Sequence, residues 1–433
     1  MRINKVFKNA SWIIGCKLGQ AILNIIVSAL TARYLGVATF GVIHYAASIT
    51  TFFAPIMQLG ITSIIVYELV ENENDEGKIL GTSIGLCFLS SLLCISGIFA
   101  FSSIANHGER ETIIVCVLYS LLLISQAFEM LQYWFQAKYL SKYTSIIMLV
   151  AYVITTVYKI ILLATGKSVF WFALSHTIDY AIVAIGLFCV YRKLGKQKLS
   201  FSFKISKRLL SRGKYYILSN MMIVIFASTD KIMIKLMIGN EATGNYSAAV
   251  ACAGMTSFVF SAIIHSMTPL ILSHKKNEDD ESYKKSIKLL YSIVIFLALA
   301  QSIVMTVLPK LIIQILYGSE YFGAIIALQV VVWYTTFSYI GAVRDVWILA
   351  ESKQKLLLVI NVSGALTNII LNAILIPLMG IVGAAIASLI TQIFTNFIMG
   401  YIIKPMRENN KLIIASLNPK ILLGSIKGML KKK

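Results

Sequence analysis

Charged residues are scarce in this chain: they make up 13% of its 433 residues, whereas hydrophobic residues make up 58%. The mean hydropathy of +0.79 is far above that of a soluble globular domain of this size. Apolar runs of about 20 to 25 residues are each long enough to cross a hydrocarbon core of roughly 30 Å as a helix. The composition therefore excludes a soluble domain and predicts an all-α integral membrane protein.

Signs of enzymatic or metal chemistry are missing as well. No phosphate-binding loop of the form GxxxxGK[ST] occurs, so we do not expect the chain to use ATP directly. The six cysteines form no CxxC motif and have no histidine at metal-ligand spacing, so they are interpreted as small core residues. No set of nucleophile, base and orienting residue stands out. We expect no catalytic residues, no metal and no cofactor.

Twelve segments are predicted to span the membrane. They are residues 10–34, 39–66, 79–105, 112–137, 143–165, 168–191, 213–238, 243–272, 286–308, 321–348, 355–377 and 380–403. The first lacks a small-residue cleavage site after a short apolar core, so a removable signal peptide is not expected.

Basic residues gather in alternate loops. The inner loops and ends hold 30 of the 39 Lys and Arg residues, whereas the outer loops hold only Arg33, Arg110, Lys167 and Lys310. This positive-inside pattern predicts that both termini are cytoplasmic. Because topology accounts for the net charge of +20, no nucleic-acid partner is expected.

Two short segments repeat. "LGVATFGVIHYAAS" (35–48) contains Gly36 and Gly41, and "IGNEATGNYSAAV" (238–250) contains Gly239 and Gly244, each 203 residues later. Acidic inner loops follow both copies. Short helical hairpins favour glycine in any case. A duplication, however, explains both matches and predicts two lobes of six helices, a pseudo-twofold axis along the membrane normal and a central cavity.

The predicted organisation follows from this duplication. An N-terminal lobe (1–191) precedes a basic cytoplasmic linker (192–212), a C-terminal lobe (213–403) and a basic cytoplasmic tail (404–433). In the tail Leu422, Ile426 and Leu430 share one face beside several lysines, and an interfacial helix is one interpretation of that pattern.

Five basic residues remain inside the spans. They are Lys17, Lys159, Lys231, Lys235 and Arg344. A charge at mid-bilayer depth costs about 2.5–3.5 kcal/mol on insertion scales, so these groups should face a wet interior. Lysines near a span end can instead reach the headgroups, which is open for Lys159 and Lys235. Arg344 with its neighbour Asp345 suits a local pair.

Helical spacing places several of these groups on common faces. Lys17, Gln20 and Asn24 follow steps of three and four and continue as a polar stripe along the first span. Lys231 and Lys235 are also four apart and share a face. The two lobes should therefore present cations to one cavity, which predicts an anionic ligand.

Acids inside the spans suggest a coupling mechanism. They are Glu129, Asp179, Asp230 and Asp345. Asp179 follows His176 by three residues, so the pair could exchange a proton and couple transport to a proton gradient. A satisfied polar contact between helices is the alternative. His44 and His265 are interpreted as interfacial or packing residues.

Three segments resemble a known family. "LNAILIPLMGIVGAAIAS" (371–388), "STDKIMIKLMIGNEATGNYSAAV" (228–250) and "YWFQAKYLSKY" (133–143) are similar to segments of polysaccharide exporters in the multidrug, oligosaccharidyl-lipid and polysaccharide exporter superfamily. The resemblance covers most of the chain and is closest to the bacterial O-antigen flippases. The third segment has Ala137 where the family usually has glycine.

The resemblance implies a function and a location. Such a protein would move an undecaprenyl-pyrophosphate-linked oligosaccharide across the bacterial inner membrane, from the cytoplasmic to the periplasmic leaflet, by alternating access. It implies cationic cavity residues at Lys17, Lys159 and Lys231 and an acidic residue at Asp230. The lipid bilayer, a polysaccharide polymerase and a chain-length regulator are the implied partners.

Other functions fit the sequence less well. A cation-coupled multidrug exporter of the same superfamily would need an acid-dominated cavity, whereas the spans hold five basic and four acidic residues. A membrane glycosyltransferase or polymerase would need large outer loops. A lipid II flippase normally carries two further spans, for which the segment after residue 403 is too short.

Overall fold

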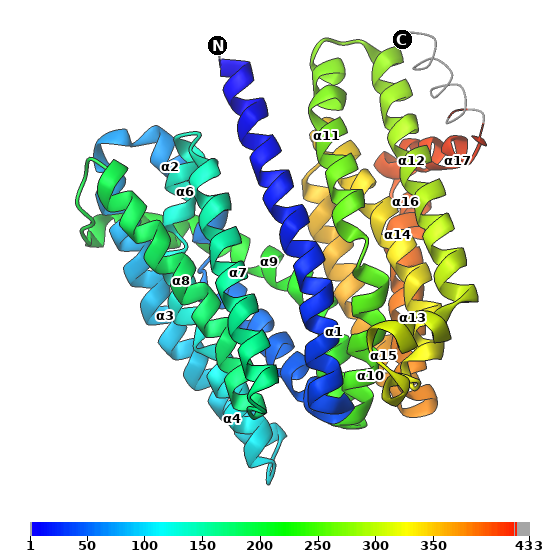
Figure 1. The fold of residues 1–433 in the computed structure, drawn as a ribbon. Helices are drawn as coiled ribbons and strands as arrows, with labels where there is room; N and C mark the ends of the chain where they lie inside the picture. The colour runs from blue at the N-terminus through cyan, green and yellow to red at the C-terminus, as the bar shows by residue number, and fades with distance from the viewer. Residues whose placement is uncertain (1, 420, 422–433) are drawn as a thin grey trace. The chain divides into compact units, whose positions relative to one another are not determined.

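The computed structural model describes residues 2–419 and 421, and it describes the side chains of residue 15 and of those from residue 18 onward. All regular secondary structure in this part of the chain is helical, which confirms the predicted all-α class (Figure 1). Ten of its helices are long and apolar enough to cross a membrane.

Two of these ten helices each contain two spans joined at a glycine. In α1 (Arg2–Met57) the backbone is non-helical at Gly36, with φ 75° and ψ 168°. In α15 (Lys355–Ile393) it is non-helical at Gly380, with φ 62° and ψ −140°. Glycine adopts positive φ without a Cβ clash. Dividing both helices at these kinks gives the predicted twelve membrane-crossing segments.

The chain forms two compact units, Met1–Gly244 (unit 1) and Asn245–Lys433 (unit 2). Unit 1 contains α1, η1 (Ile61–Ser63), α2 (Ile65–Glu71), η2 (Glu73–Asp75), α3 (Glu76–Ala105), α4 (Arg110–Ser120), α5 (Leu122–Phe128), α6 (Leu131–Ala137), α7 (Ser141–Ala164), α8 (Val169–Leu194) and α9 (Phe203–Met237). The next helix, α10 (Asn240–Gly254), begins in unit 1. The predicted lobe boundaries and pseudo-twofold axis stay predictions.

Unit 1 is organised around α1. This helix packs against α4, α7 and α9, while α8 contacts α4, α5 and α7. Tyr45, Phe135 and Phe172 are among its largest fully buried side chains. The helices that carry most of the predicted site residues therefore share one core.

The repeated glycines of the two copies meet inside unit 1. A Cβ added to Gly41 would collide with the carbonyl oxygen of Asn240, and one added to Gly244 would collide with that of Val37. Asn240 lies 203 residues after Val37, as Gly244 does after Gly41. Exchanging the copies therefore maps this contact onto itself, as in a two-fold interface, in agreement with a duplication.

The segment between α8 and α9 is shorter than the predicted linker. Only residues 195–202 are non-helical, because α9 already begins at Phe203. Ile205 and Leu209 are buried while the basic residues between them are at least partly exposed, so this first part of α9 is amphipathic. The basic stretch therefore combines a short connection with the start of the seventh span.

Unit 2 is built on α12. It contains the rest of α10, then α11 (Ser257–Lys276), α12 (Asp280–Val307), α13 (Pro309–Leu316), η3 (Ser319–Tyr321), α14 (Ala324–Ala350), α15, a π-helical turn η4 (Phe394–Ile398), α16 (Met399–Ile402), η5 (Lys404–Met406) and α17 (Arg407–Ser416). The early tail helix α17 packs on α12, where the Tyr291 hydroxyl donates to Asn409 Oδ1 at 2.7 Å. The predicted tail face of Leu422, Ile426 and Leu430 lies outside the described residues.

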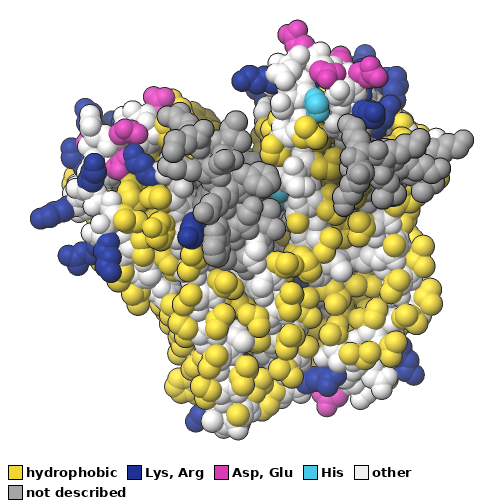
Figure 2. All heavy atoms as spheres, turned by 45° about the horizontal axis from the view of Figure 1, so that its top comes forward, with side chains coloured by type: hydrophobic (Ala, Val, Ile, Leu, Met, Phe, Trp, Pro, Cys, Tyr) yellow, Lys and Arg dark blue, Asp and Glu magenta, His cyan; other side chains and the backbone are white. Residues whose placement is uncertain are grey.

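The outer surface of each unit suits a lipid environment. Figure 2 shows hydrophobic side chains over much of the viewed face, with Lys and Arg gathered toward its ends. Ile104, Leu93 and Leu378 are 81%, 75% and 74% exposed. Exposing such side chains is unfavourable in water but not in a bilayer.

Cys189 is also exposed, so the interpretation of every cysteine as a core residue is wrong at that position.

Candidate functional site

Two lysines and two histidines from four helices gather in unit 1. Lys159 Nζ of α7 lies 3.5 Å from His176 Nε2 of α8. His44, in the second half of α1, lies within electrostatic range of both Lys159 and Lys231 of α9. All four side chains are half-buried. We call His44, Lys159, His176 and Lys231 the cationic cluster.

Each histidine of the cluster packs against an aromatic ring. The His176 ring lies 4.7 Å from that of Tyr119 on α4, at an angle of 35°. The His44 ring meets that of Phe40 edge-on, at 4.4 Å and 72°. Because such contacts restrict ring rotation, the imidazole nitrogens are held in position beside the lysines.

The predicted coupling acid Asp179 borders the cluster. Thr155 Oγ1 lies 3.0 Å from Asp179 Oδ1 and 2.9 Å from the carbonyl oxygen of Ala151. A hydroxyl has one hydrogen to donate, so two full hydrogen bonds form here when Asp179 is protonated and donates to Thr155. Glu129, after the last residue of α5, lies within electrostatic range of Asp179.

Lys159 is near both members of the predicted proton pair. It contacts His176 and is within electrostatic range of Asp179. No hydrogen bond joins His176 directly to Asp179 among the side chains that the structure describes. Proton exchange between these two residues stays a prediction.

The polar stripe of α1 is visible in part. The side chain of Lys17 lies outside those described. Gln20 is half-buried, and Asn24 is exposed. Asn24 Oδ1 accepts a hydrogen bond of 3.1 Å from the hydroxyl of Tyr152 on α7. This contact joins the stripe to the helix that carries Lys159.

Of the three predicted residues on α9, Lys235 lies in a different setting from Lys231. Lys235 is 6% exposed, and its Nζ lies 2.8 Å from both carboxylate oxygens of Glu109 and 5.9 Å from the centre of the Tyr45 ring. Among the described residues no hydrogen bond or ion pair joins it to the cationic cluster. Asp230 is buried. The binding roles of all three residues stay predictions.

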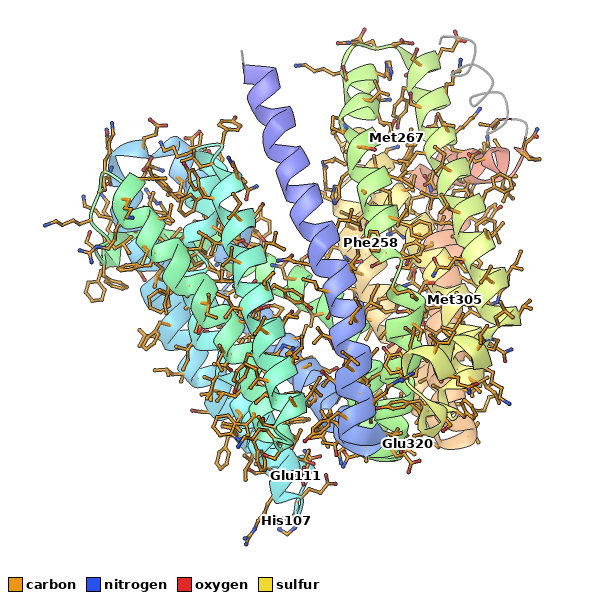
Figure 3. The ribbon with its side chains drawn as sticks, in the orientation of Figure 1. His107, Glu111, Phe258, Met267, Met305 and Glu320 are labelled. Carbon is orange, nitrogen blue, oxygen red and sulfur yellow. The ribbon has the colours of Figure 1, made fainter. Side chains whose placement is uncertain are left out.

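Glu109 stands in the turn between α3 and α4. Figure 3 shows its neighbours His107 and Glu111 at that turn. Burial alone would raise the pKa of Glu109, but hydrogen bonds from Lys235 and Thr112 outweigh it and hold the pKa below its usual value. The carboxylate is therefore charged over the whole neutral range and neutralises Lys235.

Several of these groups were not singled out in the sequence. The sequence favours an interfacial or packing role for His44, and it gives no signal for Thr155 or Glu109 taken singly. Tyr152, Thr155 and Lys159 follow steps of three and four along α7, so the periodicity that revealed the α1 stripe would have found this face as well. Nothing local indicated that Glu109 would meet Lys235.

An ion-pair network around a buried carboxylate lies at the basic end of unit 1, and no sequence pattern indicates it. Glu68 of α2 is fully buried, with its carboxylate 3.1 Å from Arg208 Nη2 and 2.5 Å from Arg212 Nη1 of α9. Breaking a buried pair by removing one partner is strongly destabilising. The network therefore fixes the start of α9 to the rest of unit 1.

Unit 2 holds a different polar interior. Arg344 Nη2 lies 2.7 Å from Asp345 Oδ1, which confirms the predicted local pair, and Nη1 donates to Asn396 Oδ1 at 2.6 Å. Asn372 donates to Asn368 at 3.0 Å, and Asn368 donates to Ser388 at 3.2 Å. Apart from Arg344 and Asp345, the groups in these contacts are uncharged.

Comparisons of the amino-acid sequence identify relatives. A family profile described as polysaccharide biosynthesis protein matches residues 6–275, more than half of the chain. The uncharacterized membrane protein MJ1068 of Methanocaldococcus jannaschii is 27% identical over 238 residues, which are 52% of this chain and 45% of that protein. The probable flippase AglR of Haloferax volcanii is 22% identical over 391 residues, 87% of this chain and 79% of that protein.

Solved structures share the fold. The lipid II flippase MurJ in an inward closed conformation has a TM-score of 0.74 at 16% identity, covering 96% of this chain and 92% of its own. An inward-facing multidrug resistance MATE family transporter has a TM-score of 0.69 at 12% identity, covering 90% and 96%. At these identities the likeness shows a shared transporter fold alone.

Proposed function

The chain belongs to the polysaccharide biosynthesis protein family, and from this premise we propose that it is a flippase for an undecaprenyl-pyrophosphate-linked oligosaccharide, such as an O-antigen repeat unit. Membership confirms the predicted kinship with polysaccharide exporters, and the fold is that of a multi-pass membrane transporter. Bacterial inner-membrane location, cytoplasmic termini and transfer toward the periplasmic leaflet are parts of the proposal. A polymerase and a chain-length regulator stay predicted partners.

The cationic cluster carries this proposal. Lys159 and Lys231 come from different helices, and His44 lies within electrostatic range of both. A pyrophosphate diester is anionic, and lysine is a compact charge on a flexible stem that suits capture and release of phosphate. The imidazoles of His44 and His176 add donors at fixed positions. The cluster thus supplies what the linkage between lipid and sugar would need inside a membrane.

The remaining predicted residues have roles at the edges of this site. Gln20 and Asn24, with Lys17 on the same predicted face, would offer hydrogen bonds to sugar hydroxyls. In an alternating-access cycle, the pyrophosphate would bind the cluster while the lipid tail stays in the bilayer. Lys235 would join in binding only after leaving Glu109.

A proton could drive the cycle through Asp179. Protonation would let Asp179 donate to Thr155 while Thr155 donates to the Ala151 carbonyl, so both short contacts become hydrogen bonds. Loss of the proton leaves a carboxylate within electrostatic range of Lys159. The charge state of Asp179 would then set how strongly Lys159 attracts an anion.

Transport in reconstituted vesicles tests the proposed function. Purified protein would be given a fluorescent lipid-pyrophosphate oligosaccharide, and transfer between leaflets would be timed. We expect Lys159→Ala and Lys231→Ala each to slow transfer about tenfold, the cost of losing roughly 1.4 kcal/mol of binding. The control is Lys167→Ala, which removes an exposed outer-loop lysine. Normal transfer by both cluster variants would refute the phosphate-binding role.

Export of cationic drugs by a cation-coupled transporter is the second candidate. The proximity of Glu129 and Asp179 favours it, because two nearby acids attract cations. The transporter fold is equally compatible with both activities. In the same vesicles, movement of a cationic dye that depends on Asp179, without movement of the lipid-linked sugar, would support the exporter over the flippase.

A further inference from the structure

Two adjoining hollows open on the outer surface of unit 1. One, of about 280 Å³, lies between α5 and α8 and is lined by apolar side chains that include Ile124, Phe128, Ile185 and Phe188. The other, of about 330 Å³, lies between α3, α5 and the α8–α9 connection and also includes Phe128. Phe128 lines both, so the two hollows adjoin, and we call them together the lateral groove.

The lateral groove lies near the basic end of the helices. Phe188 precedes the last residue of α8 by six positions, a rise of about 9 Å along a helix. Gly81 follows the first residue of α3 by five positions. With the predicted topology, the groove would lie at the depth of the leaflet that faces the basic loops.

Exposed basic residues lie next to lining residues of the groove, in space for Arg192 and in sequence for Lys198. The Arg192 guanidinium lies 5.9 Å above the ring of Phe188, which lines the groove. Lys198 directly precedes Leu199, another lining residue. Arg192, Lys193 and Lys198 are all exposed. An apolar channel with a cationic rim matches a lipid whose headgroup is negative.

The wall formed by the α8–α9 connection is held rigidly. Gly77 and Gly81 of α3 lie so close to it that an added Cβ would collide with the carbonyl oxygens of Lys198 and Ser200. The Ser200 backbone amide donates to the Gly77 carbonyl at 3.2 Å, and the Gln197 side-chain Oε1 accepts from the Gly77 amide at 2.9 Å. These contacts hold this wall in place before a ligand binds, and such preorganisation lowers the cost of binding.

Two exposed aromatic rings extend this wall toward the bilayer. Phe201 and Phe203 are 45% and 85% exposed, and their rings meet edge-on at 5.2 Å. An exposed aromatic pair beside lysines is typical of a segment that inserts into the membrane interface. We propose that the lateral groove binds an anionic phospholipid of the bilayer, with one acyl chain in the hollows and its phosphate against Arg192 and Lys198.

Native mass spectrometry of the purified full chain tests this site. Phosphatidylglycerol and phosphatidylcholine with identical chains would be added separately, and the fraction of protein that retains one lipid would be measured. We expect at least fivefold more retention of phosphatidylglycerol. Equal retention of the two lipids would overturn the proposal.

Variants separate the headgroup from the chain. Arg192→Gln with Lys198→Gln should reduce phosphatidylglycerol retention to the phosphatidylcholine level, whereas the control Lys284→Gln with Lys285→Gln, exposed in unit 2, should not. Ser125→Leu with Ala181→Leu, which fills the groove from α5 and α8, should lower retention of both lipids. Size-exclusion profiles check folding. Unchanged phosphatidylglycerol retention in the charge variant or in a folded groove-filling variant would refute the site.

Competition identifies the occupant. Unlabelled phosphatidylglycerol should displace the bound lipid, while inorganic phosphate and a polyprenyl phosphate should not at the same concentration. Displacement by inorganic phosphate would show a site for the anion without a chain. Preferential displacement by the polyprenyl phosphate would show a site for the transported lipid. Either result would contradict an occupant drawn from bulk phospholipid.

Discussion

The interiors of the two units differ in kind. Unit 1 brings together ionisable groups, including Lys159, His176 and Asp179. Unit 2 holds the adjacent pair Arg344 and Asp345 and connects Asn368 and Asn372 by a hydrogen bond between amides. Charged groups inside a membrane are costly and mark ligand or proton pathways, whereas neutral hydrogen bonds hold helices together. We therefore expect ligand binding in unit 1, and we interpret the amide contacts of unit 2 as structural.

The hairpin glycines Gly41 and Gly244 occupy matching positions in the two repeated segments. Gly41→Ala would place a Cβ against a backbone carbonyl that cannot swing aside. We expect it to destabilise the protein by about 3 kcal/mol, the upper range for overpacking, and to reduce the yield of folded protein on size exclusion. Gly254→Ala is the control, because no atom lies within 4 Å of its added Cβ. Equal stability of the two variants would show that the contact between Gly41 and Asn240 is not tightly packed.

The amide contacts of unit 2 should matter for stability rather than for anion binding. Asn368 is fully buried and bonds both Asn372 and Ser388. Asn368→Leu should lower the free energy of unfolding by about 1–3 kcal/mol, since buried partners lose hydrogen bonds. Exposed Asn277→Leu is the control. If Asn368→Leu instead weakens pyrophosphate binding at unchanged stability, the contrast between the units fails.

The acid in unit 1 should control the pH dependence of transport. Asn at position 179 can donate to Thr155 as the protonated acid would, but it cannot release a proton. We expect Asp179→Asn to reduce the pH-driven change in transport rate to less than about twofold. A twofold change in rate corresponds to roughly 0.4 kcal/mol of activation free energy. The measurement is transport in vesicles at several pH values. An unaltered pH response would remove Asp179 from coupling.

The smallest expected effect concerns the pair between Glu109 and Lys235. Because the pKa of Glu109 is lowered in the folded state, the pair stabilises the protein above the unfolded value, about 4.3, and this contribution is lost as pH falls through the folded pKa. Glu109 is 43% exposed, so solvent screening limits the effect to under about 1 kcal/mol.

Melting temperatures of the native chain and of Glu109→Gln, measured between pH 7 and pH 3, test this expectation. The native chain should be the more stable one at neutral pH, and the difference should shrink as the solution is acidified. Thr112→Val, which removes only the hydroxyl donor to Glu109, is a control with a smaller change. A difference that grows on acidification would contradict the sign.

The site was predictable only in part. Insertion cost alone singled out Lys159 and Lys231, because a charge in hydrocarbon needs a polar surrounding wherever it packs. The same reasoning named Lys235. Its partner Glu109 lies 126 residues earlier, in a turn whose contact with α9 no sequence pattern indicates. His44 looked like a packing residue because the charges near it come from other helices.

The amino-acid sequence alone determined the twelve spans, the alternation of basic loops and the repeat of 203 residues. Each follows from a local cost, that of placing a polar or charged group in hydrocarbon, which is set residue by residue along the chain. The tertiary structure decided which charges neutralise one another and which remain together, and it created the lateral groove. Those outcomes depend on how helix faces distant in the chain pack against one another, and the hydropathy pattern does not indicate which faces pair.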